Sequence, residues 1–282
     1  MSRIFFNKVA IIGVGLIGGS LGMAVKKNRL AKEVVGMARR PKTITEAIKL
    51  KAIDRGSIEP QIIKGADLVV LATPVATIID IVPKLKKYLT KGCIVIDVGS
   101  CKQEIVSQIE KTLPPAVSFI GCHPLAGSEK KGVAAAAADI FSDSLTIITP
   151  SSRSRHSQAL RKIKLLWQAL GAKVVILSPK QHDKILAFLS HLPHILAFSL
   201  INCVPSQYLS LSPCSLREMT RIAASDSLLW RDILLMNRGN LLCAIAGFTA
   251  QLNKLRSMLS RSDGSRLLQI LTRAKSKREK IL

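Results

Sequence analysis

The chain has the sequence VAIIGVGLIG at residues 9–18, and this stretch decides the fold. A run of apolar residues leads into Gly13, Gly15 and Gly18, and a helix-like segment follows. In dinucleotide-binding folds the first such glycine permits a tight turn, the second lets the backbone approach a pyrophosphate, and the third lets the helix pack against the strand. The helix N-terminus would add free N–H groups and a positive dipole. We therefore predict a dinucleotide-binding unit in which the cofactor contacts are Gly13, Gly15, Leu16, Ile17 and Gly18.

The first 178 residues alternate short apolar runs with helical stretches. Because apolar strands that alternate with helices are typical of a parallel sheet covered on both faces, we predict a mostly parallel, Rossmann-type sheet. The expected strands are residues 9–13, 34–37, 68–72, 93–98, 117–121, 145–149 and 174–177. The expected helices are residues 17–27, 43–51, 76–88, 103–112 and 156–170.

The pattern changes after Pro179. Residues 181–204 form a long apolar stretch without strand punctuation, and the segments 218–224 and 228–247 also lack β-alternation. The predicted fold class is therefore α/β, with a Rossmann-type domain at residues 1–179 and an all-helical domain at residues 180–282.

Composition limits the classes of function. Of the 282 residues 48% are hydrophobic, which allows a large core, and the formal net charge is +24. Such a charge fits either a protein that binds nucleic acid or a basic enzyme that attracts anionic small molecules. No zinc-finger, RRM or KH signature is present, so we expect small anionic ligands and no nucleic-acid partner.

The cysteines and the apolar run near the N-terminus bear on location. The six cysteines include no C-x-x-C pair and no metal-like cluster with histidine, which indicates reduced thiols and no metal site. Residues 9–25 are apolar but fall short of the roughly 20 residues that span a bilayer. We expect a cytoplasmic protein with no membrane partner.

The end of the second expected strand bears on the choice of dinucleotide. An acidic residue at this point binds the ribose hydroxyls in NAD-type sites. Here the chain continues Met37-Ala38-Arg39-Arg40, with no carboxylate in reach. A guanidinium pair suits a 2′-phosphate, whereas two solvated arginines are the alternative interpretation. We favour NADP over NAD.

Three further stretches carry polar residues in positions that a buried structural role does not explain. The sequences DVGSCK at residues 97–102 and GCHPLAGSE at residues 121–129 lie where two parallel strands should end, which is where ligands bind in this architecture. The third, SHLPH at residues 190–194, lies inside the long apolar helix, where Ser190 and His194 share a face.

These stretches together resemble the prephenate and arogenate dehydrogenases. The motifs GVGLIGGS, LATPV, DVGSCK, HPLAGSEKKG, SHLPH and TRIAASDSLLWRDI occur in that family's order, and the match covers residues 8–250. The resemblance implies a Rossmann domain, a helical domain that binds substrate and forms a homodimer, and an active site between them. It also implies oxidative decarboxylation of an anionic cyclohexadienyl substrate, prephenate or arogenate, in tyrosine biosynthesis.

The resemblance also assigns roles to individual residues. His123 resembles the catalytic histidine that accepts the proton of the substrate ring hydroxyl, and Ser100 resembles the serine beside it and the nicotinamide. His194 and Arg221 resemble the substrate-binding pair. The other expected substrate residues are Ser190, Ser128, Glu129 and Trp230, and Thr73 of LATPV joins Arg39, Arg40 and Ser100 at the cofactor.

One departure leaves the substrate open. The family usually has a glycine-rich stretch before TRIA, whereas residues 211–216 here are LSPCSL. Proline fixes its backbone and removes a donor, so the preference for prephenate or arogenate stays undecided.

Two alternatives remain at this point. A β-hydroxyacid dehydrogenase or imine reductase would use a lysine such as Lys184, although it would not explain HPLAGSE and SHLPH. A catalytically silent, NADP-sensing protein would use the charge to bind nucleic acid.

Overall fold

The computed structural model describes residues 5–127 and 130–281. Within these residues eight strands form one sheet in the order β3-β2-β1-β4-β5-β6-β7-β8. All neighbouring pairs are parallel except β6 and β7, which confirms the predicted mostly parallel sheet. The strands are β1 (Phe6–Ile12), β2 (Ala31–Met37), β3 (Arg55–Ser57), β4 (Leu68–Leu71), β5 (Ile94–Asp97), β6 (Ser118–Leu125), β7 (Leu145–Pro150) and β8 (Lys173–Ile176).

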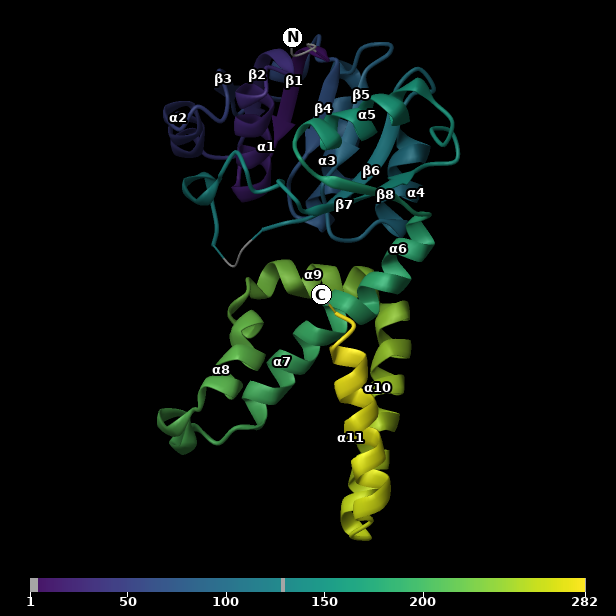
Figure 1. Cartoon of the computed structure of the whole chain (residues 1–282). Coiled ribbons are helices and arrows are strands. Elements are labelled where there is room, and N and C mark those ends of the chain that lie inside the picture. The colour runs from purple at the N-terminus through teal and green to yellow at the C-terminus, as the bar shows by residue number, and fades with distance from the viewer. Residues whose placement is uncertain (1–4, 128–129, 282) are drawn as a thin grey trace.

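Helices cover both faces of this sheet (Figure 1). Leu21 of α1 and Trp167 of α5 belong to one apolar cluster, and Ile78 of α3 and Ile109 of α4 belong to the other. Successive residues at positions 9–12 of β1 point to alternate clusters, which is why this strand is apolar throughout. The helices of this domain are α1 (Leu16–Lys27), α2 (Pro41–Lys49), α3 (Val75–Leu85), α4 (Gln103–Thr112) and α5 (Gln158–Ala169).

Strand β3 and the end of β6 differ most from the sequence prediction. The short edge strand β3 was not predicted, because Arg55-Gly56-Ser57 has no apolar run and is a strand only through its pairing with β2. The expected end of β6 at Gly121 is wrong, since the strand continues to Leu125. The antiparallel partner β7 extends it, and His123 lies within the strand opposite Ile147.

The rest of the chain is helical and lies on one side of the sheet domain (Figure 1). Helices α10 and α11 form a hairpin that extends away from the sheet, and α9 lies between this hairpin and the sheet domain. Short 3₁₀ turns link several elements, among them η3 (Val133–Ala135), η5 (Ser206–Leu211) and η6 (Arg221–Ala224). The helical elements are α6 (Pro179–Leu186), the π-turn η4 (Ala187–His191), α7 (Leu192–Cys203), α8 (Cys214–Thr220), α9 (Ser227–Met236), α10 (Arg238–Ser260) and α11 (Gly264–Arg278).

The segment at residues 228–247 is helical, as the lack of β-alternation indicates, but it is divided between two helices. The structure has two helices, α9 and α10, that meet at Asn237 with a bend of 92°. The Asn237 side-chain amide donates a hydrogen bond to the carbonyl oxygen of Asp183 at 2.8 Å and lies 3.0 Å from Nδ1 of His191. Contacts with α6 and η4 therefore accompany the break, and Gly239 follows it in the first turn of α10.

Candidate active site

The glycine turn after β1 combines close packing with open space. Gly13 has a φ of +92°, and a Cβ there would lie 2.6 Å from the carbonyl oxygen of Ala72. A Cβ at Gly18 would lie 2.2 Å from the carbonyl oxygen of Gly13, whereas a Cβ at Gly15 would have no atom within 4 Å. The Thr73 hydroxyl is buried without a hydrogen-bond partner within the described part of the chain. Tight packing at two glycines, room at the third and a spare donor nearby fit a dinucleotide pyrophosphate.

The register of the sheet aligns the other predicted site residues with this turn. Ile12, Leu71, Asp97 and Gly121 pair in succession across β1, β4, β5 and β6. Within three residues after these positions, the chain carries in order the glycine turn, Thr73, Ser100 and His123. Parallel strands therefore bring four separate motifs to one edge of the sheet, where ligands bind in such folds.

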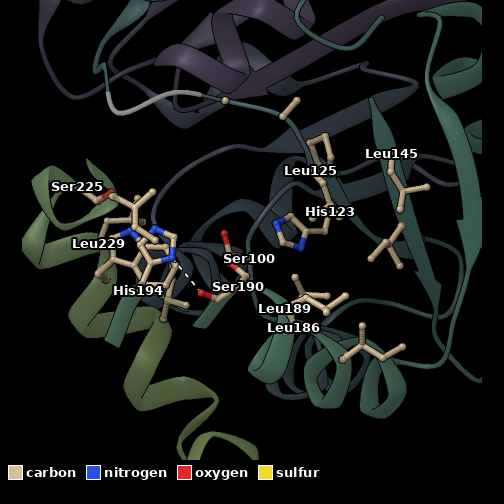
Figure 2. Close-up of a pocket in the computed structure, with 18 of the residues that line it drawn as sticks. Ser100, His123, Leu125, Leu145, Leu186, Leu189, Ser190, His194, Ser225 and Leu229 are labelled. Carbon is tan, nitrogen blue, oxygen red and sulfur yellow. Dashed lines mark hydrogen bonds between the residues drawn. The ribbon is translucent and has the colours of Figure 1, made fainter. Parts of the chain in front are cut away.

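A cavity of about 800 Å³ lies between this edge and the helical region. Ser100 and His123 face it from the sheet domain, and Ser190 and His194 face it from the helices (Figure 2). Arg221 and Trp230 also line it, while leucines such as Leu186 and Leu189 supply apolar walls. The structure thus brings six of the predicted site residues together around one space.

His123 is buried at the inner wall of this cavity, with 9% of its surface exposed. Its Nδ1 lies 2.8 Å from Nε2 of His182. Burial, followed by the charges of His182, Lys102 and His191, holds the pKa of His123 well below its ordinary value. The ring is therefore neutral at physiological pH and can accept a proton from a ligand in the cavity.

His182 and Asp183 were not selected from the sequence. His182 Nδ1 lies 2.7 Å from Oδ1 of Asp183, and the backbone N–H groups of Lys102 and Gln103 donate to the two carboxylate oxygens at 2.8 and 2.9 Å. A signal was available: His182 and Asp183 form a polar pair directly before a long apolar stretch and immediately after the expected domain boundary.

The π-turn η4 positions the polar residues of the helical wall. Wide turns of this kind often occur at functional sites. Pro193 lacks a backbone donor, and the ring of His194 donates from Nδ1 to the carbonyl oxygen of Ser190 at 2.9 Å. One face of the His194 ring stacks on Trp230, with centroids 3.4 Å apart. Burial lowers the pKa of His194, the Ser190 carbonyl partly offsets this, and Arg221 lowers it further.

The loop that carries Ser100 is braced by a buried ion pair. Lys102 and Asp97 are both fully buried and lie in contact, and the Lys102 ammonium also donates to the carbonyl oxygens of Gly99 and Cys101 at 2.7 and 3.1 Å. The Gly99 N–H donates to Asp97 at 2.9 Å. This network fixes the backbone on both sides of Ser100.

Other predicted residues lie elsewhere. Arg39 and Arg40 are exposed at the end of β2 and the start of α2, away from the cavity, and neither pairs with an acidic side chain of the described residues. Ser128 and Glu129 lie outside the described residues. Lys184 is exposed and does not line the cavity, which removes the support for a lysine-dependent mechanism. No group of three or more metal-ligating side chains is present in residues 5–127 and 130–281.

Comparison with known proteins gives a consistent result along the chain. The family model described as prephenate dehydrogenase, nucleotide-binding domain, matches residues 21–176, and the one described as prephenate dehydrogenase, dimerization domain, matches residues 178–273. A prephenate dehydrogenase of Bacillus subtilis is 34% identical over 97% of this chain and 76% of its own length. A cyclohexadienyl dehydrogenase of Zymomonas mobilis is 33% identical over 94% of this chain and 92% of its own.

Solved structures agree. Prephenate dehydrogenase from Aquifex aeolicus, in complex with hydroxyphenyl propionate and NAD+, matches with a TM-score of 0.91 and 33% identity over 98% of both chains. Synechocystis arogenate dehydrogenase matches with a TM-score of 0.84 and 25% identity over 98% of this chain and 100% of its own. A pyrroline-5-carboxylate reductase from Coxiella burnetii, at 17% identity and a TM-score of 0.55, shares the fold alone. The chain therefore belongs to the prephenate dehydrogenase family of nicotinamide-dependent oxidoreductases.

Proposed function

We propose that this chain catalyses the nicotinamide-dependent oxidative decarboxylation of prephenate or arogenate in tyrosine biosynthesis. One observation carries the proposal: a neutral, buried His123 lines the same cavity as His194 and Arg221, at the edge of the sheet that carries the glycine turn. A proton acceptor and residues suited to an anionic ligand are thus arranged around one space.

The substrate is a cyclohexadiene whose ring hydroxyl lies opposite a ring carboxylate. His123 would take the hydroxyl proton as the C–H bond on the same carbon breaks. A nicotinamide bound at the glycine turn would supply the acceptor for that hydride. The carbon–carbon bond to the carboxylate then breaks, and its electron pair makes the ring aromatic and leaves carbon dioxide. A general base of this type contributes roughly 10²–10⁴ in rate.

The remaining cavity residues would hold the anionic substrate. Arg221 would bind a carboxylate through charge-assisted hydrogen bonds, which are stronger than neutral ones. His194 donates a hydrogen bond from Nδ1 to the Ser190 carbonyl, which would hold its ring in a fixed orientation beside the substrate. We also assign Ser100, Ser190 and Trp230 to this site, and Ser128 and Glu129 by resemblance. The positive net charge would attract the anion.

The preferred dinucleotide is NADP in this proposal. Support comes from the exposed Arg39 and Arg40 and from the lack of a carboxylate at the end of β2. The NAD+ in the Aquifex aeolicus complex belongs to that protein. We therefore expect this chain to differ from that protein at the residues that bind the adenosine ribose of the dinucleotide.

We further propose that the helical region pairs with a second copy of the chain. It exposes large apolar side chains, and residues 179–203 are long and apolar enough to cross a membrane. The mean hydropathy is 1.6, and only 22% of an 18-residue window of this stretch is buried within the chain. A protein partner is favoured over lipid because this stretch carries the polar His182–Asp183 pair and the matching family domain is a dimerization domain. Strongly exposed apolar residues of the helical region include Leu189, Leu211, Met219, Leu228, Leu242 and Leu268.

Light scattering after size-exclusion chromatography tests the assembly. A mass twice that of the 30.6 kDa chain is expected without detergent. A monomer, or a protein that stays soluble only in detergent, would contradict the proposed dimer.

The cysteines support a cytoplasmic location. All six are free thiols, and Cys93, Cys101 and Cys122 are buried. Free thiols persist in reducing compartments. Fractionation of cells that express the protein tests this location, and recovery in the membrane fraction would contradict it.

A grid of initial rates tests the activity. Prephenate and arogenate are each combined with NADP and NAD, and reduced cofactor and carbon dioxide are measured together. We expect turnover that releases one carbon dioxide per reduced cofactor. No turnover in any of the four combinations, together with salt-dependent binding of DNA or RNA, would favour the nucleic-acid alternative instead.

A further inference from the structure

We infer that His182 and Asp183 are positioning residues that set the proton arrangement of His123, so that its Nδ1 carries the ring proton and its bare Nε2 faces the cavity. The inference deepens the proposed function and rests on it, because it explains how His123 is held ready to act as the base. Three side chains from two parts of the fold form the relay: His123 on β6, and His182 and Asp183 on α6.

The first step concerns the carboxylate. Asp183 accepts hydrogen bonds from the backbone N–H groups of Lys102 and Gln103, at the start of α4, as well as from His182. Burial acts to raise the pKa of Asp183, but the hydrogen bonds from His182 and from the two N–H groups outweigh it and leave the pKa below its ordinary value. Asp183 is therefore ionised at neutral pH, and an ionised carboxylate can only accept hydrogen bonds.

The second step fixes the ring of His182. Since Asp183 can only accept, Nδ1 of His182 must carry a proton. Burial lowers the pKa of His182, and the Asp183 carboxylate offsets this only in part, so the ring is neutral at physiological pH. A neutral imidazole has one ring proton, which leaves Nε2 of His182 as an acceptor.

The third step carries this constraint to His123. Nε2 of His182 lies 2.8 Å from Nδ1 of His123, so the bond forms only if Nδ1 of His123 donates. The neutral His123 then has a bare Nε2, and its ring points into the cavity toward Ser100 (Figure 2). Nothing would hold the proton of an isolated imidazole on Nδ1. The relay therefore selects the form of His123 in which Nδ1 is protonated and the exposed Nε2 is the base.

The relay also stabilises the charge that forms when His123 accepts a proton. The same logic operates in the Ser-His-Asp triad, where a buried aspartate orients the histidine and stabilises the imidazolium. Here His182 is interposed between the carboxylate and the base. Nearby Lys102 is paired with Asp97, and His191 is bonded to Asn237, so Asp183 is the anion of the relay that contacts its histidines, through His182.

The structure holds the relay at both ends. Asp183 is tied to the start of α4 through its side chain and to Asn237 through its backbone carbonyl, which accepts at 2.8 Å. His182 is fully buried, and its ring is tilted against that of His123 with centroids 5.0 Å apart. Small movements of the helical region relative to the sheet would therefore displace the base directly.

Two matched variants test the relay. In His182→Gln the side-chain amide reaches the place of Nε2, so its oxygen can accept from His123 while its NH₂ group is drawn toward Asp183. In His182→Asn the amide is shorter and can reach only Asp183. We expect kcat of the Gln variant to stay within about tenfold of the native enzyme, whereas the Asn variant loses roughly 10²-fold, with KM and the Kd of a product analogue little changed in both. Equal kcat in both variants and the native protein would overturn the inference.

A direct measurement does not depend on turnover. The ¹⁵N chemical shifts of the imidazole nitrogens distinguish the protonated from the bare nitrogen, and the chain has only five histidines to assign. We expect His123 of the native protein to be protonated at Nδ1 above pH 7, and the His182→Asn variant to lose that preference. A native His123 protonated at Nε2 overturns the inference even if the enzyme is active. The expected shifts with no turnover on any substrate would instead contradict the proposed function and leave the relay in place.

Discussion

The indole of Trp230 stacks on the imidazole of His194, with ring centroids 3.4 Å apart and ring planes 21° apart. The two rings come from different helices, α9 and α7, and both line the cavity. With Nδ1 of His194 bonded to the Ser190 carbonyl, one ring face and one nitrogen of His194 are fixed. Nε2, the other ring nitrogen of His194, therefore points in a fixed direction.

Substitution of Trp230 should weaken substrate binding more than it slows the reaction. Aromatic pairs contribute roughly 0.5–1.5 kcal/mol beyond their buried area, so Trp230→Leu should raise KM by about twofold to tenfold. Trp230→Phe keeps a stacking surface and serves as the control. Steady-state kinetics check this, and an unchanged KM in the Leu variant would contradict a role for the stack in binding.

His123→Asn should bind substrate and cofactor but lose about 10²–10⁴ of its turnover. The asparagine amide can keep a hydrogen bond to His182 in place of Nδ1, whereas nothing replaces Nε2 as proton acceptor. Calorimetric binding of NADP and of a product analogue, measured beside kcat, separates the two effects. Native-like turnover in this variant would remove His123 from the role of base.

Gly15→Ala and Gly18→Ala should have opposite consequences. In Gly15→Ala the new Cβ would occupy open space at a residue whose φ is −98°, so the thermal unfolding midpoint should stay unchanged while the Kd of the dinucleotide rises. In Gly18→Ala the new Cβ would lie 2.2 Å from the carbonyl oxygen of Gly13, so this variant should lower the midpoint. Thermal unfolding without and with cofactor compares them, and an unchanged cofactor affinity in Gly15→Ala would place the pyrophosphate elsewhere.

The double variant Arg39→Ala, Arg40→Ala should lose preference for NADP. Hydrogen bonds to charged groups contribute about 1.5–3 kcal/mol, so the KM for NADP should rise roughly tenfold or more while the KM for NAD changes little. Adding Ala38→Asp to Arg39→Ala should favour NAD further. Lys49→Ala removes a positive charge from the opposite end of α2 and is the control. A native enzyme that already prefers NAD would contradict the arginine argument.

Acid should destabilise the folded protein through its buried histidines. Burial, which outweighs the opposing charge of Asp183, lowers the pKa of His191 to about 4. Its folded pKa lies below the unfolded value of about 6.5, so the unfolded chain binds the proton first, and stability falls as pH drops from about 6.5 toward 4. The pKa shift of His191 alone should lower the free energy of unfolding by about 3 kcal/mol at acid pH, which corresponds to a fall in the unfolding midpoint of roughly 6–12 °C.

Thermal unfolding of His191→Gln across the same range checks this expectation. The variant should be less stable at neutral pH because a buried ring is lost, but its midpoint should fall less on acidification. His156→Gln, which removes an exposed histidine, should follow the native pH profile. A slope in His191→Gln as steep as the native one would show that His191 is not held neutral.

Local sequence was sufficient for the elements whose geometry depends on near neighbours. The glycine turn is one such case, since residues 9–18 contain the strand, the turn and the start of the helix together. The alternation of apolar strands and helices likewise indicated the sheet, because each element buries its own apolar face. The Ser178-Pro179 pair, followed by a long apolar stretch, marked the change to helices for the same reason.

Tertiary structure decided the features that depend on distant partners. β6 continues to His123 because β7 pairs with it, and α9 and α10 are separated at Asn237, which bonds to Asp183, 54 positions earlier. His182 meets His123 across 59 positions. No local propensity encodes such a contact, since its energy arises only when strand and helix have packed. The sequence thus singled out the histidine that lines the cavity, and the packed fold decided which of its ring nitrogens meets His182.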